Sequence, residues 1–245
     1  MNPLAKSKIK YIKSLQLKKH RIREGKFIVE GGKSVREFLQ SGFVVSELVA
    51  TADFYAGIAA TAMPARCYVT DASTLAALGT YTTNNAALAV VEIPPRADLN
   101  LGPEDLLLAV DKLNDPGNLG TIIRIADWFG IRKLLLSHDA VDVYNPKVVN
   151  ASKGSLTRVA VHYANLPAVL AAYPGPVLAA EMTGEYLPEV KPLRAGIILM
   201  GSEAHGLREE LAPYITRRVT IPRLGGAESL NVAVATGIIC YHLLN

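Results

Sequence analysis

The feature that most restricts the fold is a series of continuous apolar runs in the second half of the chain. Segments with the apolar periodicity of helices separate most of these runs. Unbroken apolar runs are typical of parallel strands, because helices cover both faces of such a sheet. We therefore expect an α/β domain with a mostly parallel sheet. The runs are DLLLAVDKL, RKLLLS, TRVAVHY, PVLAAEMT, RAGIILMGS and RRVTIPR.

The first part of the chain has shorter apolar runs that also alternate with helix-like stretches, which predicts a smaller α/β domain. Between the two parts lies PPRADLNLGPE, residues 94–104, which is rich in proline and polar residues and is typical of a linker. We expect a first domain at residues 1–95, a linker at 96–104 and a second domain at 105–245. With 50% apolar and 20% charged residues, the chain does not have the composition of a disordered protein.

Positive charge is concentrated at the start of the chain. Residues 1–26 contain nine Lys or Arg residues and one acid, a net charge of +8, and the other 219 residues carry −4. Ile9, Ile12 and Leu15 share one face of a basic helix, which we expect to be followed by a flexible basic turn. Such an arm fits either a polyanion such as RNA or a solubilising tail. The candidate RNA contacts are Lys18, Lys19, Arg21 and Arg23.

Several classes of protein are disfavoured. Two cysteines, Cys67 and Cys240, indicate neither a disulfide framework nor a structural metal site, so we expect no metal. We find no apolar stretch of membrane-spanning length and no secretion signal, and we expect a cytoplasmic protein. The segment GGKS at 31–34 is not a P-loop, because Phe27 occupies the position of the first glycine.

Residues 111–130, DKLNDPGNLGTIIRIADWFG, form the first of three loops with functional residues. We expect Pro116 and Gly117 to form a turn and Asn118 to cap the following helix. Arg124 lies about one turn inside that helix, where an arginine can bind phosphate. The alternative is a surface arginine paired with Asp127.

The other two loops follow later strands. In IILMGSEAHGLREEL, Gly201 and Glu203 come directly after a buried run, where ligands of α/β sheets bind, although Glu203 could merely begin a helix. In VTIPRLGGAESLNVAVATGIICYHLL, Ser229 and Asn231 precede a helix, and Ser229 could be a simple N-cap. We find no catalytic triad and no metal-ligand spacing in these loops.

In this order, the three loops resemble the SpoU family (SPOUT superfamily) of RNA ribose 2′-O-methyltransferases. The resemblance rests on NDPGNLGTIIRIAD, MGSEAHGL and IPRLGGAESLNVAVATGI, and it covers residues 106–245. The segment NPKVVNASKGSLTRVAV, residues 145–161, is also similar to the stretch between the first two motifs. Residues 1–93 more loosely resemble the L30e-like RNA-binding domain that many members carry.

The resemblance implies a deep C-terminal trefoil knot, a homodimer, and S-adenosylmethionine as cofactor. It also implies that the cofactor contacts backbone around Leu199, Gly201, Ile221 and Leu230. The functional polar residues would be Asn118, Arg124, Glu203, Ser229 and Asn231. We interpret Arg124 as a phosphate clamp that also assists proton loss, because a guanidinium with a pKa above about 12 is a poor base.

The predicted function is therefore 2′-O-methylation of a ribose in structured RNA, most simply ribosomal RNA. Transfer RNA is the alternative substrate, and a non-catalytic RNA-binding protein is the alternative class. A methyltransferase acting on small molecules would not explain the basic arm.

Overall fold

The computed structural model describes residues 2–202 and 206–245, and the chain divides into two compact units. The first unit comprises Met1–Pro95 and Asp142–Thr157, and the second comprises Arg96–Val141 and Arg158–Asn245. A short segment from the second half of the sequence is thus built into the first unit. Among the described residues, no helix is both long and apolar enough to span a membrane.

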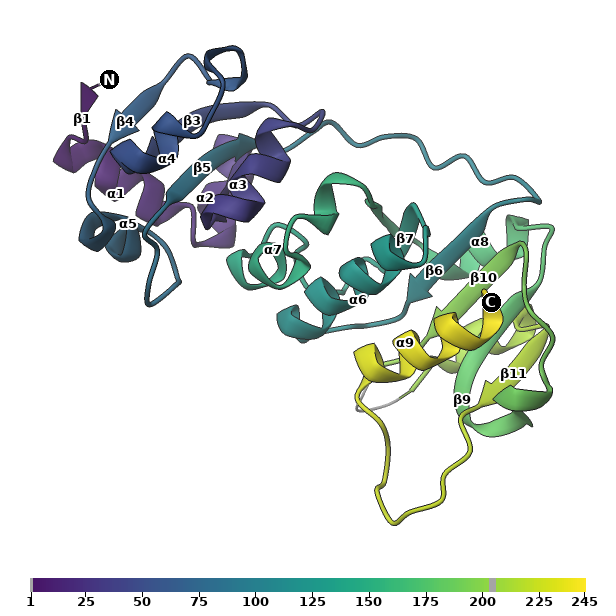
Figure 1. Ribbon diagram of the computed structural model, residues 1–245. Helices are drawn as coiled ribbons and strands as arrows, with labels where there is room; N and C mark the ends of the chain where they lie inside the picture. The colour runs from purple at the N-terminus through teal and green to yellow at the C-terminus, as the bar shows by residue number, and fades with distance from the viewer. Residues whose placement is uncertain (1, 203–205) are drawn as a thin grey trace. The chain divides into compact units, whose positions relative to one another are not determined.

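The first unit is a five-stranded mixed sheet with helices against it (Figure 1). The strand order is β1-β4-β3-β5-β2, in which β3 and β4 are parallel and β5 is antiparallel to β3 and β2. The strands are β1 (Asn2–Pro3), β2 (Lys26–Glu30), β3 (Val45–Ala50), β4 (Cys67–Val69) and β5 (Ala87–Glu92). The helices of residues 1–95 are α1 (Lys6–Ser14), α2 (Lys18–Glu24), α3 (Gly32–Leu39), α4 (Ala52–Ala56), η1 (Ala60–Ala62) and α5 (Ala72–Leu78).

The N-terminal basic segment folds as two helices. Ile12 and Leu15 are fully buried and Ile9 packs against the same apolar cluster, as the helical periodicity predicts. The expectation of a flexible basic turn is wrong, because residues after Leu17 form α2, which ends at Gly25 in the left-handed conformation. Asp71 caps α5 by accepting a hydrogen bond from the Thr74 amide, as its position in the sequence predicts.

The segment Asp142–Thr157 contains α7 (Pro146–Ser152) and η2 (Ser155–Thr157) and packs against β2. Its Tyr144 ring lies 4.6 Å from that of Phe27, measured between centroids. Asn150 donates hydrogen bonds to Thr80 Oγ1 (2.9 Å) and to the buried carboxylate of Glu30 (3.3 Å). Rings and polar side chains from both parts of the sequence therefore complete the interior of this unit.

The second unit has a six-stranded sheet of order β11-β9-β10-β6-β7-β8, in which every neighbouring pair is parallel. This confirms the parallel α/β fold expected from the apolar runs, and each run supplies one strand. The trefoil knot stays a prediction. The strands are β6 (Leu106–Val110), β7 (Lys133–Ser137), β8 (Ala160–Ala164), β9 (Val177–Tyr186), β10 (Gly196–Met200) and β11 (Arg217–Thr220).

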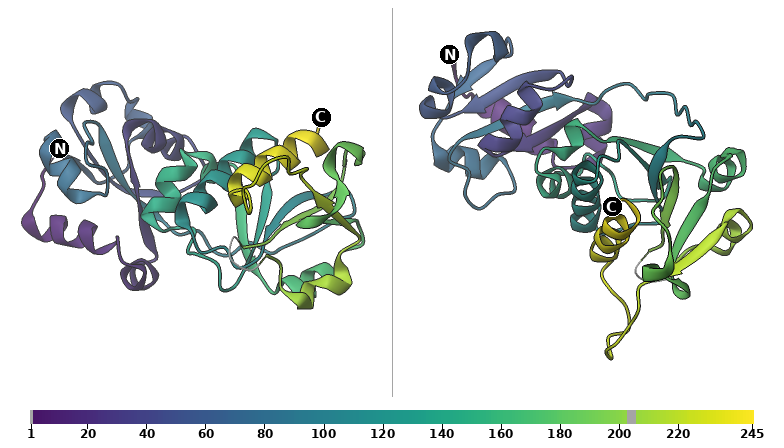
Figure 2. Two further views of the ribbon diagram at one scale, coloured as in Figure 1. Left: turned by 90° about the horizontal axis from the view of Figure 1, so that it is seen from below. Right: turned by 45° about the vertical axis from the view of Figure 1, so that its right-hand side comes forward.

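Helices cover both faces of this sheet (Figure 2). On one face, α6 (Pro116–Trp128) packs beside α9 (Val232–Leu243). On the other face, α8 (Leu166–Ala172) and η4 (Glu209–Tyr214) enclose an apolar cluster with the strands. A short turn, η3 (Leu187–Glu189), follows β9. The helical turn after β10 is the 3-10 helix η4, which contains Pro213, and proline disfavours a continuing α-helix.

Candidate functional site

A cleft of about 620 Å³ lies at the carboxyl ends of β10 and β11 and beside the middle of β9, at Ala180, Glu181 and Met182. The long segment between β11 and α9, residues 221–231, extends away from the sheet and forms one wall (Figure 1). Apolar side chains such as Met200, Ile221 and Ile239 dominate the lining, and Glu181 and Arg223 add one charge of each sign. Ligand sites of α/β sheets commonly lie at this edge, and a mostly apolar cleft with a few charged groups is typical of a small-molecule site.

Three of the four predicted cofactor-contact residues line this cleft, namely Gly201, Ile221 and Leu230. The fourth, Leu199, is fully buried and belongs to the apolar cluster under α8 and η4, so its side chain faces away from Met200. Alternate residues of a strand point to opposite faces, and this leaves only the Leu199 backbone for a contact at the cleft.

The predicted polar residues come from distant parts of the sequence. Asn231 Nδ2 donates a 3.0 Å hydrogen bond to Asn118 Oδ1. Asn231 also caps α9, because its Oδ1 accepts from the amides of Ala233 and Val234. Ser229 lines the cleft and is not the cap of that helix. Glu203 lies outside the described residues.

The expected cap of α6 is wrong. Asp115 is the N-cap, and its Oδ1 accepts a 2.7 Å hydrogen bond from the Asn118 amide. Pro116 occupies the first turn, where its fixed φ fits a helix start, so the helix begins earlier than Asn118. The Asn118 side chain is consequently available to contact Asn231.

Arg124 is exposed on α6, one turn after Thr121. Among the described residues, the carboxylate of Asp127 is bound by Arg158, with an Nη2–Oδ2 distance of 2.8 Å, and not by Arg124. The expected alternative, a surface pair between Arg124 and Asp127, is therefore not seen among the described residues, and the phosphate-binding role of Arg124 stays a prediction.

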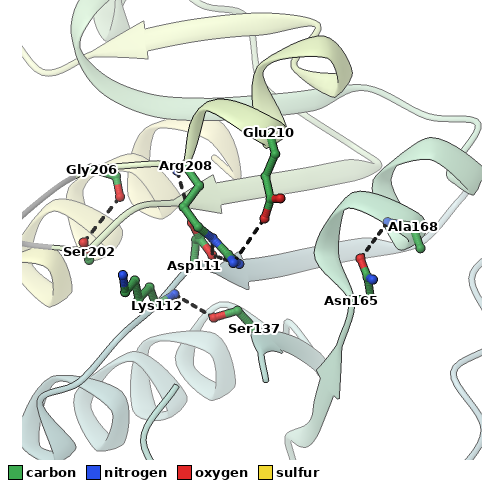
Figure 3. Close-up of polar contacts among 9 residues, drawn as sticks. All are labelled: Asp111, Lys112, Ser137, Asn165, Ala168, Ser202, Gly206, Arg208 and Glu210. Atoms are coloured by element: carbon green, nitrogen blue, oxygen red, sulfur yellow. Dashed lines mark hydrogen bonds and ion pairs between the residues drawn. The ribbon is translucent and has the colours of Figure 1, made fainter. Parts of the chain in front are cut away.

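An ion pair with a buried carboxylate lies at the same edge of the sheet (Figure 3). It was not predicted from the sequence. Asp111 directly follows β6, is fully buried, and accepts hydrogen bonds from the Arg208 guanidinium at 2.6–3.0 Å. A charged residue at the end of an unbroken apolar run was the available signal. Its partner, 97 residues later, carried no signal of its own.

The proposed RNA contacts separate into two groups. Lys18, Lys19 and Arg23 are exposed on α2. Arg21 is only 2% exposed, and its guanidinium binds Asp142 and the carbonyl oxygens of Leu15 and Gln16. This contradicts a direct RNA contact by Arg21, because all of these partners lie in the interior of the first unit.

Cys240 does not supply a reactive thiol. It is buried in α9, and burial raises the pKa of its thiol to about 12. Within residues 2–202 and 206–245, no group of three or more His, Cys, Asp or Glu side chains could hold a metal ion.

Two family models match the chain. Residues 105–241 match the SpoU rRNA Methylase family, and residues 6–89 match the MRM3-like substrate binding domain. The 23S rRNA (guanosine(2553)-2'-O)-methyltransferase RlmP of Bacillus subtilis is 30% identical over 246 residues, which cover 96% of this chain and 95% of that protein.

Two solved structures are similar over almost the whole chain. One is described as a putative RNA methyltransferase of the TrmH family from Porphyromonas gingivalis, with a TM-score of 0.86, 38% identity, and coverage of 99% of this chain and 98% of that one. The other is an AdoMet-bound rRNA methyltransferase from Sinorhizobium meliloti, with a TM-score of 0.87, 27% identity, and coverage of 99% and 96%.

Proposed function

The chain belongs to the SpoU rRNA methylase family, and on this premise we propose that it methylates the 2′-oxygen of a ribose in ribosomal RNA with S-adenosylmethionine. The observation that carries the proposal is the cleft, which the second and third motifs line, together with the hydrogen bond that joins Asn118 of the first motif to Asn231 of the third. The similar Sinorhizobium meliloti protein holds AdoMet and is an rRNA methyltransferase by name.

The residues of the cleft fit this cofactor. A volume of about 620 Å³ lies within the usual range for small-molecule sites, roughly 300–1,000 Å³. Ile221, Leu230 and Met200 offer apolar surface for an adenine ring. Glu181 and Arg223 carry charges opposite to those of the methionine ammonium and carboxylate. When bound, S-adenosylmethionine would supply an electrophilic methyl group on a sulfonium.

Arg124 is proposed to hold the RNA phosphate beside the target ribose. A guanidinium matches phosphate with two parallel hydrogen bonds, and Arg124 is exposed more than two turns inside α6. With the cofactor bound, the bond between sulfur and the methyl carbon would break as the carbon–oxygen bond forms, a neutral thioether would leave, and the 2′-hydroxyl proton would pass to water. A bound cation lowers the cost of the negative charge on that oxygen, so Arg124 assists proton loss without being the base.

Asn118, Asn231 and Ser229 are proposed to hold the geometry of this site. The 3.0 Å hydrogen bond between Asn118 and Asn231 joins the start of α6 to the start of α9. Ser229 adjoins that junction in the wall of the cleft. Glu203 is proposed to orient Arg124. Positioning of this kind supplies much of the rate of a transfer between two bound groups.

The first unit is proposed to bind the RNA, through Lys18, Lys19 and Arg23. Their exposure on one short helix and the match to a substrate-binding domain support this role. Ribosomal RNA is preferred over transfer RNA because the relative that spans the whole chain is named for 23S rRNA. The cytoplasm remains the expected location.

A homodimer is proposed from an apolar face on the second unit. Val234, Ile238 and Tyr241 on α9 are 39–68% exposed, and Trp128 at the end of α6 is 84% exposed. Thr121 and Ile125 of α6 line a shallow groove together with α9. Ile238→Glu should convert the dimer to a monomer in light scattering, whereas Met182→Glu, on β9, should not. A wild-type monomer at micromolar concentration would refute the proposal.

The substrate is tested by transfer of a labelled methyl group from S-adenosylmethionine to separated rRNA and tRNA from cells that lack the enzyme. Incorporation into the rRNA fraction is expected. Incorporation into tRNA alone would establish the alternative substrate. Binding of cofactor and RNA without any transfer would establish a non-catalytic RNA-binding protein.

A further inference from the structure

Part of the cleft lining comes from the segment that follows β10, where two of the four described lining residues are glycines. Gly201, Ser202, Gly206 and Leu207 line the cleft, and we call them the glycine wall. Ser202 and Gly206 exchange two backbone hydrogen bonds of 3.0 Å. A Cβ atom at Gly201 would lie 2.4 Å from the Gly206 carbonyl carbon. Backbone atoms of these glycines can hold a ligand only if the backbone itself is fixed in place.

One residue contacts both ends of the glycine wall. On the entry side, the Asp111 amide donates a 2.9 Å hydrogen bond to the carbonyl of Met200, the last residue before Gly201. On the exit side, the Asp111 carboxylate accepts from the Arg208 amide at 3.2 Å and from its guanidinium at 2.6–3.0 Å. Arg208 directly follows Leu207, so Asp111 binds the residue before the glycine wall and the residue after it, and Figure 3 shows its contact with Arg208.

Asp111 is itself held in place. Lys112 has a left-handed φ of 53°, and its amide donates a 2.7 Å hydrogen bond to the buried Ser137 hydroxyl at the end of β7. Three neighbouring strand ends, those of β10, β6 and β7, are thereby joined. Because Asp111 is fully buried, its carboxylate depends on the Arg208 cation for stabilisation. The same hydrogen bonds raise the pKa of Arg208, which also binds Glu210 at 3.1 Å.

We propose that Arg208 and Asp111 are positioning residues, whose ion pair fixes the glycine wall in the shape that binds the cofactor. Neither residue needs to touch the reacting atoms. They raise cofactor affinity, because a mobile wall would have to be ordered at each binding event and the lost entropy would weaken binding. The inference rests on the proposed function, since it concerns the same cleft.

A matched ion pair at the opposite edge of the sheet provides a control. Lys133 Nζ, at the start of β7, binds both carboxylate oxygens of Asp105 at 3.0 Å, directly before β6. The two pairs are matched in their cations alone: Lys133 is 33% and Arg208 36% exposed, whereas the carboxylate of Asp105 is 30% exposed and that of Asp111 is fully buried. Loss of either pair should lower the melting temperature, but only the pair at the carboxyl edge adjoins the cleft.

The test compares Arg208→Gln, Arg208→Lys and Lys133→Gln by calorimetric titration with S-adenosylmethionine and by methyl transfer. We expect Arg208→Gln to raise the Kd for the cofactor at least 10-fold and its KM in parallel, with kcat at saturating cofactor within about threefold of wild type. Arg208→Lys should recover part of the affinity, since lysine keeps the charge but not the paired hydrogen bonds. Lys133→Gln should leave Kd unchanged.

A Kd for Arg208→Gln within twofold of wild type would overturn the proposal. So would equal weakening in Lys133→Gln, because a general loss of stability would then explain the effect. If Arg208→Gln fails to fold, the Kd of Arg208→Lys decides, and a wild-type value there also overturns the proposal. A wild-type protein that binds no S-adenosylmethionine would refute the proposed function itself, which separates the two failures.

Discussion

The two units are built from the same kinds of elements but use charge in different ways. In the first unit, exposed cations such as Lys18, Lys19 and Arg23 lie on a helix surface. In the second unit, a few polar groups sit at the carboxyl ends of parallel strands, where hydrogen bonds fix Asn118, Asn231 and Asp111. Exposed positive charge attracts a polyanion such as RNA, and polar groups that hydrogen bonds hold in place can stabilise the charge that develops on one reacting atom. Substitutions in the first unit should therefore weaken RNA binding, and substitutions in the second unit should lower cofactor affinity or kcat.

The largest effect is expected at Arg124. Arg124→Ala should lower kcat for methyl transfer about 100-fold or more, because a preorganised cation beside a developing negative charge contributes most in the transition state. Its cofactor Kd should stay within twofold of wild type. Single-turnover kinetics at saturating RNA measure the first quantity and calorimetry the second.

Arg132→Ala is the control for this experiment, since Arg132 is an exposed arginine just before β7, at the amino edge of the parallel sheet and thus away from the strand ends that adjoin the cleft. Its kcat should equal that of wild type. If Arg124→Ala kept its turnover, Arg124 would not belong to the active site. The proposal that the second unit uses fixed polar groups for chemistry would then be contradicted.

Arg21 differs from the exposed cations of the basic arm, because its side chain is buried in the first unit and binds Asp142. Arg21→Met should destabilise the protein by about 3 kcal/mol, since it breaks a buried ion pair with Asp142. Arg23→Met, which removes an exposed pair with Glu24, should cost less than about 1 kcal/mol. Urea unfolding measures both, and equal losses would contradict the burial of Arg21.

Gly201 tests the shape of the cleft. Gly201→Ala should weaken cofactor binding about 10-fold, because the added Cβ would lie 2.4 Å from the Gly206 backbone and must displace it. Gly225→Ala, in the opposite wall, meets no atom within 4 Å and should bind normally. Titration of both variants with S-adenosylmethionine would disprove the account if Gly201→Ala bound like wild type.

The smallest effect per residue is expected on the surface of the first unit. Replacement of Lys18, Lys19 and Arg23 together by Gln should weaken RNA binding about 10-fold and reduce the slope of log K against log salt by about 2. Cofactor affinity should not change. Filter binding across a salt series measures the slope, and an unaltered slope would show that these residues form only a solvated face.

Much of the second unit could be predicted from the sequence. Its six apolar runs correspond to the six strands. They could be recognised because a strand that is covered on both faces has apolar residues at almost every position. The functional polar residues could be named only by resemblance, since Asn118 and Asn231 are 113 residues apart and only the folded chain brings them together.

The remaining errors share a physical cause. Arg21 looked like its exposed neighbours, because the sequence gives no sign that the acid Asp142 would bury it, 121 residues later. The segment Asp142–Thr157 lies within residues 105–241 of the SpoU match, as the expected second domain does, yet its Tyr144 and Asn150 pack in the first unit. In both cases a tertiary contact, and not local pattern, decides where the residue lies.

The central claim is that the second unit places a ribose 2′-oxygen for methyl transfer. The most direct test is to methylate ribosomal RNA with isotopically labelled S-adenosylmethionine, digest it to nucleosides, and locate the label by mass spectrometry. The account predicts the label on the 2′-oxygen of a single ribose, and its absence with Arg124→Ala. Label on a base, or cofactor binding with no label on RNA, would contradict it.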